Sequence, residues 1–172
     1  MSRLPIRLYG DPVLWARARE VSEVTDDLRE FAEILRETMM EADGAGLAAN
    51  QVGDLRRIIA VNLGDFDSND DIRILVNPEI TTRDGTSKMV EGCLSLPGIE
   101  EEVDRDARLS VRYMNLDGGS EEVNVSGIHA AIIQHEIDHL DGVLFIDRIS
   151  SMRRKFLRGA LKKISRGSKQ PA

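Results

Sequence analysis

The stretch that decides the fold of this chain is Gln134-His135-Glu136-Ile137-Asp138-His139-Leu140-Asp141-Gly142. From residue 126 to about 140 the apolar residues recur at helical spacing, which predicts a helix. Residues four apart lie on one helix face, so His135 and His139 can bind one metal ion through imidazole nitrogens. Glu136 is turned by about 100° from His135 and can stand beside the metal without ligating it. This is the place for a general acid/base that moves a proton between water and a leaving amine.

The pattern H-E-x-x-H is typical of metallohydrolases, although it can also be two helix histidines hydrogen-bonded to their surroundings. Catalytic zinc-type sites usually have three protein ligands, so two histidines leave the site incomplete. Downstream the only acids are Asp141 and Asp147, and no further histidine follows. The single cysteine, Cys93, lies upstream in Glu-Gly-Cys-Leu-Ser (91–95), where a glycine would let the backbone approach a metal.

A third stretch, Gly-Ala-Gly-Leu-Ala-Ala-Asn-Gln (44–51), is rich in small residues. Such a segment suits close approach of a ligand to the main chain, and Gln51 could donate an amide N–H to a developing oxyanion. The alternative is an ordinary loop or tight packing.

Outward from these stretches, the remaining patterns predict helices and mostly antiparallel strands. A helix is expected to begin near Thr25 and to end before Gly44, and Asp11-Pro12 marks a short helix start. Residues rich in β-branched side chains or alternating in polarity predict strands over 57–63, 72–76, 109–116 and 121–125. The chain is therefore expected to be a single compact α+β domain, with a central metal-binding helix and a C-terminal amphipathic helix.

Size and composition fit this expectation. The 172 residues suit one domain, and one cysteine excludes an intramolecular disulfide. No apolar run approaches the roughly 20 residues of a membrane span, and the N-terminus has no signal core, so a cytoplasmic location is expected. The net charge is −7, yet residues 151–172 hold eight of the 23 Lys and Arg and no acid. Such a basic tail favours contact with a polyanion.

Taken together, the three stretches resemble the peptide deformylase family of bacterial type. Its motifs G-x-G-L-A-A-x-Q, E-G-C-L-S and Q-H-E-x-D-H-L-x-G are all present in the family's order and spacing. The resemblance implies an enzyme that removes the formyl group from the N-terminal formyl-methionine of nascent polypeptides and releases formate.

The resemblance also implies the metal centre. Cys93, His135 and His139 would hold one divalent ion, usually Fe(II), with Zn, Ni or Co able to use the same ligands. Metal-bound hydroxide would attack the formyl carbon, and Glu136 would be the general acid/base.

Four further residues receive roles from the same resemblance. The amide of Gln51 and the backbone N–H of Leu94 would stabilise the tetrahedral oxyanion. Gly46 would contact the main chain of the substrate, and Ala45 would border the methionine pocket.

The basic tail resembles the C-terminal extension of one deformylase subgroup, which contacts the ribosome. The expected division is a catalytic domain over 1–150 and a basic helix over 151–172 within the same domain. The alternatives are a helix that packs its apolar stripe, from Met152 to Ile164, on the body and exposes solubilising charge, or contact with an anionic membrane surface.

Some positions depart from the family pattern or lie outside it. Many members have a basic residue shortly after E-G-C-L-S, whereas this chain has three acids at 100–102. These acids are either a solvated strand edge or a change in charge preference beyond the methionine. Asp138 is expected to support the metal ligands, with Arg105 as one possible partner, and His129 is interpreted as a non-ligand.

Two rival hypotheses remain. A metalloprotease or another amidase could share the H-E-x-x-H helix, although it would lack a downstream ligand here. A non-catalytic relative that only binds formylated chains or the ribosome is the second, and it would be expected to lose Glu136, Gln51 or Cys93. Release of formate without internal peptide cleavage separates these readings.

Overall fold

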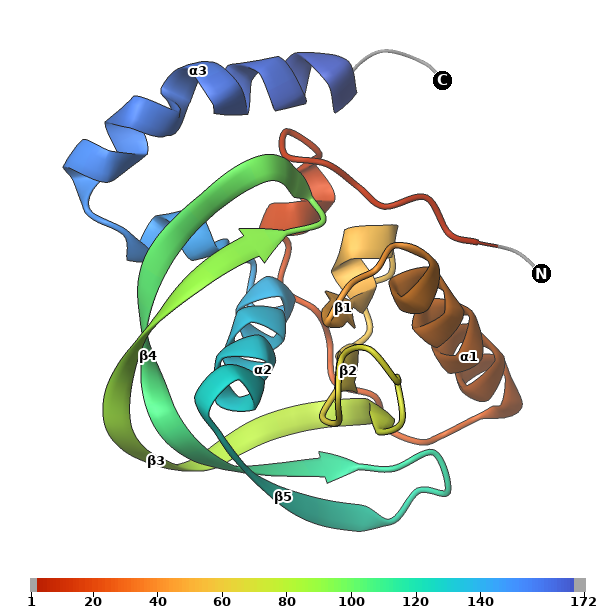
Figure 1. Cartoon of the computed structure of the whole chain (residues 1–172). Helices are drawn as coiled ribbons and strands as arrows, with labels where there is room; N and C mark the ends of the chain where they lie inside the picture. Colours follow the sequence, from red (N-terminus) through yellow and green to blue (C-terminus); the bar gives the residue numbers. More distant parts are fainter. Residues whose placement is uncertain (1–2, 169–172) are drawn as a thin grey trace.

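Five strands form one antiparallel sheet in the computed structural model, which describes residues 3–168. Each strand pairs with its neighbours in the chain, in the order β1 (Gly46–Ala48), β2 (Ile58–Asn62), β3 (Ile72–Cys93), β4 (Leu96–Met114) and β5 (Ser120–Ser126). The long β3–β4 hairpin curves around helix α2 (Gly127–Leu140), as Figure 1 shows. The expected α+β class, with mostly antiparallel strands around a central helix, is confirmed.

Helix α2 lies at the centre of the molecule, and nearly every side of it is buried. Its apolar residues pack against the sheet, with Ala130, Ile133 and Leu140 in one buried cluster with residues of β2 and β4. The glycine that closes the motif, Gly142, ends the helix region with φ +74°. A Cβ there would lie 2.5 Å from the Trp15 carbonyl oxygen, so glycine is required both by conformation and by space.

Helix α1 (Asp26–Glu41) agrees with the prediction from its pattern. Thr25 is the N-cap residue, and its hydroxyl accepts a hydrogen bond from the Leu28 N–H at 3.2 Å. The acids of the first turn, Asp26 and Asp27, complement the helix dipole. The buried face of α1 packs on β1 and β2, and β1 is the middle of the glycine-rich segment 44–51.

The strand predictions were correct for β2 and for the β4–β5 hairpin but missed most of β3 and the first part of β4. The outer parts of these strands carry charged cross-strand pairs rather than alternating apolar residues. Lys88 pairs with Asp104 at 3.0 Å, and Arg83 pairs with Asp106 at 2.6 Å. Because charged pairs on both strands leave little apolar alternation, period-two analysis could not detect them.

Three short 3-10 helices complete the fold: η1 (Pro12–Trp15), η2 (Ala49–Val52) and η3 (Phe145–Arg148). Asp11 caps η1 as its Asp-Pro start predicted, accepting a hydrogen bond from the Val13 N–H at 3.0 Å. Within residues 3–168, no helix combines the length and apolar composition needed to cross a membrane.

Helix α3 (Ser151–Ser168) lies across the end of the molecule where β3 turns into β4 (Figure 1). Its apolar stripe divides into two parts. Leu157, Leu161 and Ile164 pack with η1, η3 and the hairpin turn. Met152 and Phe156 instead remain 68% and 83% exposed, so the apolar side does not pack as a whole. The last part of the expected basic tail, residues 169–172 with Lys169, falls outside the described residues.

Candidate metal centre and its cavity

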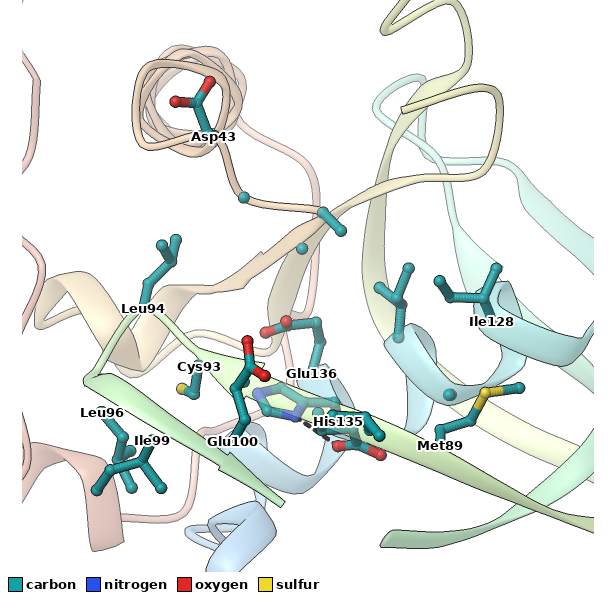
Figure 2. Close-up of a pocket in the computed structure, with 18 of the residues that line it drawn as sticks. Asp43, Met89, Cys93, Leu94, Leu96, Ile99, Glu100, Ile128, His135 and Glu136 are labelled. Carbon is teal, nitrogen blue, oxygen red and sulfur yellow. Dashed lines mark hydrogen bonds and ion pairs between the residues drawn. The ribbon is translucent and has the colours of Figure 1, made fainter. Parts of the chain in front are cut away.

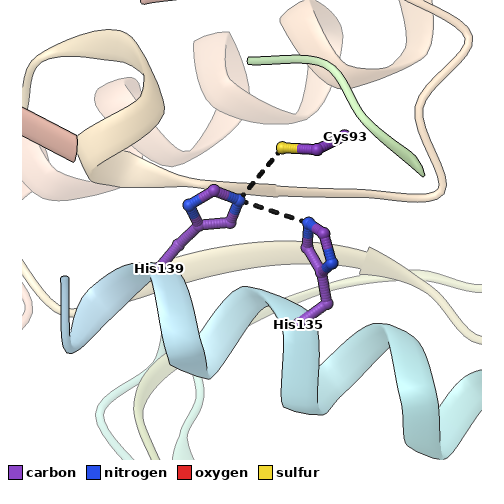
Figure 3. A group of neighbouring side chains, drawn as sticks. All are labelled: Cys93, His135 and His139. Carbon is purple, nitrogen blue, oxygen red and sulfur yellow. Dashed lines mark hydrogen bonds between the residues drawn. The ribbon is translucent and has the colours of Figure 1, made fainter. Parts of the chain in front are cut away.

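The thiol of Cys93 and the imidazoles of His135 and His139 converge at one point between β3 and α2. Figure 3 shows the three side chains facing one another. The Nε2 atom of His139 lies 3.3 Å from Cys93 Sγ and 3.2 Å from His135 Nε2. One ligand atom from each residue lies within 4.8 Å of the others, which makes the group able to hold a metal ion.

The two histidines have different surroundings. The carboxylate of Glu91 accepts a hydrogen bond from His135 Nδ1 at 2.9 Å, so Nε2 is left to face the thiol. Burial lowers the pKa of His139 well below its ordinary value, and its imidazole is therefore neutral. Although burial opposes it, the hydrogen bonds with Cys93 and Glu91 raise the pKa of His135 well above its ordinary value, so a metal ion would displace a proton from this imidazole. With that proton displaced, two imidazole nitrogens and a thiolate form a donor set that Fe(II) or Zn(II) accepts.

A buried ion network supports Glu91. Arg105 donates to both oxygens of Glu91 at 2.7 Å and to Asp138 at 2.7 Å. Burial opposes ionisation of Glu91, but the bonds from Arg105 and His135 hold its pKa below the ordinary value. The Arg105–Asp138 pairing expected from the sequence is confirmed, and Arg148 also donates to both oxygens of Asp138.

The role of Glu91 was not predicted, although its motif was recognised. The available signal was its position in the motif, two residues before Cys93. Period-two analysis did not detect this part of β3, and the β3–β4 ladder is irregular between Gly92 and Cys93, so the sequence could not show which way the Glu91 side chain points.

The predicted acid/base, Glu136, stands beside the ligands on α2 and lines the cavity next to them. Figure 2 shows its side chain near His135 and Cys93. Burial raises the pKa of Glu136 to about 7, and its Oε2 atom is buried without a hydrogen-bond partner among the described residues. A Cβ on Gly46 would lie 2.7 Å from Glu136 Oε1, so only glycine leaves room for this carboxylate.

Gln51 is held by hydrogen bonds at both ends of its amide. Its oxygen accepts from the Ala48 N–H at 2.9 Å, which directs the NH₂ group toward the metal centre. That group donates to Ser95 Oγ at 3.1 Å and lies 3.6 Å from Cys93 Sγ. The structure thus brings the amide of Gln51 to the thiol, at the end of the glycine-rich segment.

A cavity of about 780 Å³ opens in front of these residues. Its lining includes all four substrate or oxyanion candidates named from the sequence: Ala45, Gly46, Gln51 and Leu94. Apolar side chains of Phe66, Ile128 and Val90, each at least 38% exposed, line it as well. Phe66 lies in the acidic segment 64–71 between β2 and β3, and a lone aromatic residue among these acids is the sequence signal for its place in the cavity.

His129 does not join the metal centre. Its Nε2 atom lies 3.1 Å from the Gly64 carbonyl oxygen, and its ring lies against Phe66 with centroids 5.6 Å apart. This position agrees with its interpretation as a non-ligand.

The site combines an H-E-x-x-H helix, a cysteine thiol and a buried carboxylate next to a cavity. This combination is typical of a metal-dependent hydrolase. Comparison with known proteins gives the family. A family model described as polypeptide deformylase matches residues 3–155. The chain is 42% identical to a peptide deformylase of Alkalilimnicola ehrlichii over 96% of this chain and 93% of that protein.

A second relative, a peptide deformylase of Thermodesulfovibrio yellowstonii, is 42% identical over 94% of this chain and 98% of its own length. The crystal structure of the peptide deformylase from Thermus thermophilus superposes with a TM-score of 0.89 at 39% identity, covering 96% of this chain and 99% of that one. The chain therefore belongs to the peptide deformylase family of hydrolases, whose activity is removal of N-formyl groups from nascent peptides.

Proposed function

We propose that this chain deformylates the N-terminal formyl-methionine of nascent polypeptides with one divalent metal ion held by Cys93, His135 and His139. The observation that carries the proposal is the meeting of these three ligand atoms within 4.8 Å, beside a cavity that Cys93 and His135 line. When bound, the ion supplies Lewis acidity toward a carbonyl and toward water. The thiolate and imidazole donors suit Fe(II) and Zn about equally. We propose Fe(II), the usual ion of the family, with Zn, Ni or Co able to use the same ligands.

The protein residues would divide the remaining work. Glu136, with a pKa raised to about 7 by burial, can take a proton from water and return it to the leaving α-amine near neutral pH. The Gln51 amide, fixed by the Ala48 N–H, would donate to the oxyanion together with the Leu94 N–H. A donor fixed in place as Gln51 is loses little free energy to reorganisation during the reaction.

The walls of the cavity suit an extended peptide that begins with methionine. β1 is an edge strand, so one side of its backbone is not paired within the sheet. In this proposal Gly46 meets the peptide main chain there, and Ala45 borders the methionine side chain. Ile128 and other apolar residues of the cavity would cover the thioether chain.

Formate release tests the proposal. Protein purified anaerobically and loaded with Fe(II) should release formate from formyl-Met-Ala-Ser and should leave acetyl-Met-Ala-Ser and internal peptide bonds intact. Cleavage of an internal bond would favour the metalloprotease alternative. Binding of the formyl peptide without formate release would favour the non-catalytic alternative.

We also propose that residues 1–150 are the catalytic part and that α3, within the same domain, attaches the protein to the ribosome. Five basic residues of α3 are exposed and make no ion pair within residues 3–168, namely Lys155, Arg158, Lys162, Lys163 and Arg166. Such charges suit ribosomal RNA phosphates. Co-sedimentation with ribosomes should weaken steeply with salt and be lost when Lys155, Arg158 and Lys162 become Gln, without loss of formate release.

A further inference from the structure

Glu100 stands at the entrance to the metal centre. In the β3–β4 ladder it lies directly opposite Gly92, the residue before Cys93. Its Cγ atom is 3.7 Å from the position that a Cβ on Gly92 would occupy, and its side chain lines the cavity. Figure 2 shows the Glu100 side chain in the cavity beside the labelled Cys93 and Glu136. Glu100 is therefore an exposed carboxylate next to the reacting centre.

The three consecutive acids of β4 have different surroundings. Glu101 pairs with Arg153 at 2.8 Å, and Glu102 lies 3.8 Å from the amine of Lys88. Glu100 makes no ion pair within the described part of the chain, residues 3–168. Glu101 and Glu102 thus belong to surface ion pairs. Glu100 lines the cavity and has no partner of opposite charge among the described residues.

The rest of the cavity wall adds no positive charge. Four acids line it, namely Asp43, Glu91, Glu100 and Glu136, and among residues 3–168 no Lys or Arg does. Arg105 neutralises Glu91, and Glu136 is buried beside the metal ligands. Asp43, at the end of α1, is exposed and forms the opposite wall from Glu100 (Figure 2). The cavity wall thus carries uncompensated negative charge at Glu100, and Asp43 adds a second exposed acid to its lining.

We propose that Glu100, supported by Asp43, makes the enzyme prefer formyl-methionyl peptides that carry Lys or Arg at their second or third residue. This inference rests on the proposed function. Paired residues of an antiparallel ladder have Cα atoms roughly 4.5–5.5 Å apart, and an extended peptide advances about 3.3 Å per residue. In the proposed complex the formyl group of the substrate lies at Cys93. The Glu100 carboxylate, opposite Gly92, is then within reach of the side chains one or two residues after the methionine.

The test compares formyl-Met-Lys-Ser with formyl-Met-Glu-Ser, with formyl-Met-Ala-Ser as the neutral reference, at low ionic strength. The wild type should show a kcat/KM about tenfold higher for the Lys peptide than for the Glu peptide. The exposed Glu100 carboxylate attracts the Lys side chain and repels the Glu side chain, and each effect is modest at an exposed site. High salt should reduce this ratio because exposed charges are screened. Glu100→Gln should lower the ratio several-fold, and Glu100→Lys should bring it below one.

Glu102→Gln is the matched control, since it removes a charge two residues away that pairs with Lys88. Its ratio should equal that of the wild type. A wild-type ratio within twofold of one, or a ratio unchanged by Glu100→Gln, would overturn the inference. If no peptide releases formate, the proposed function fails separately. Calorimetric binding of the same peptides then decides the inference, since tighter binding of the Lys peptide supports it and equal binding overturns it.

Discussion

At the scale of single residues, Gly46 limits what can stand beside the proposed acid/base. A Cβ at this position would lie 2.7 Å from Oε1 and 2.8 Å from Cγ of Glu136. Glu136 would have to move, and misplacement of a catalytic group by about 1 Å can cost roughly 10²-fold in rate. We therefore expect Gly46→Ala to lower kcat/KM for formate release by about 10- to 100-fold, while circular dichroism shows an intact fold.

Gly159→Ala is the control for a glycine-to-alanine change. No heavy atom lies within 4 Å of the Cβ that would be added there. Its formate release should match that of the wild type. Equal activity of Gly46→Ala and the wild type would contradict the position given to Glu136.

Glu91 is the second residue whose replacement has a defined result. It accepts a hydrogen bond from His135 and two from Arg105, all inside the protein. Glu91→Gln leaves the Arg105 charge partly uncompensated and weakens the orientation of His135. Loss of such supporting partners typically costs about 10- to 100-fold in metal affinity. A Co(II) titration followed by its absorption bands should show this loss, and unchanged affinity would contradict the role of Glu91.

The sequence singled out the three candidate ligands that the structure brings together, but it indicated only part of the hydrogen-bond network around them. His135 and His139 follow from helix geometry, because residues four apart share a face. The pairing of Asp138 with Arg105 was correctly expected, at 2.7 Å. The bonds of Arg148 to Asp138 and of Glu91 to His135 were not, because they join elements whose relative positions depend on the course of the β3–β4 hairpin.

At the scale of elements, the helices were predictable and the long hairpin was not. α1 has a side-chain N-cap at Thr25 and an apolar face, and α2 has apolar residues at helical spacing, so both signals lie within the segment itself. The outer parts of β3 and β4 are stabilised by cross-strand charge pairs such as Lys88 with Asp104. Such pairs depend on the register between strands, which a sequence pattern on one strand does not contain.

Helix α3 offers a test of how far local propensity contributes to its stability. Gly159 is exposed in the middle of this helix, with open space around the position of a Cβ. Replacing glycine by alanine in a helix interior favours the helical state by about 0.8–1 kcal/mol. Gly159→Ala should therefore raise the free energy of unfolding by roughly 0.5–1 kcal/mol in urea denaturation. A lower free energy would indicate that this part of α3 is not helical in solution.

At the scale of the whole molecule, metal and fold should be linked. The three proposed ligands come from β3 and from two turns of α2, so the complete site exists only in the folded chain. A ligand that binds only the native state raises stability by about 2.7 kcal/mol at 100 times its dissociation constant. Removal of the metal by a chelator should therefore lower the melting temperature by several degrees, and added Fe(II) or Zn(II) should restore it. An unchanged melting temperature would contradict the linkage.

The central claim is that Glu136 moves the proton while Cys93, His135 and His139 hold the metal. The most direct test measures formate release from formyl-Met-Ala-Ser and metal content together, in the wild type and in Glu136→Gln. We expect one ion per chain in both proteins and a kcat lower by about 10²- to 10⁴-fold in the variant. Undiminished turnover in Glu136→Gln, or loss of the metal from it, would contradict this division of roles.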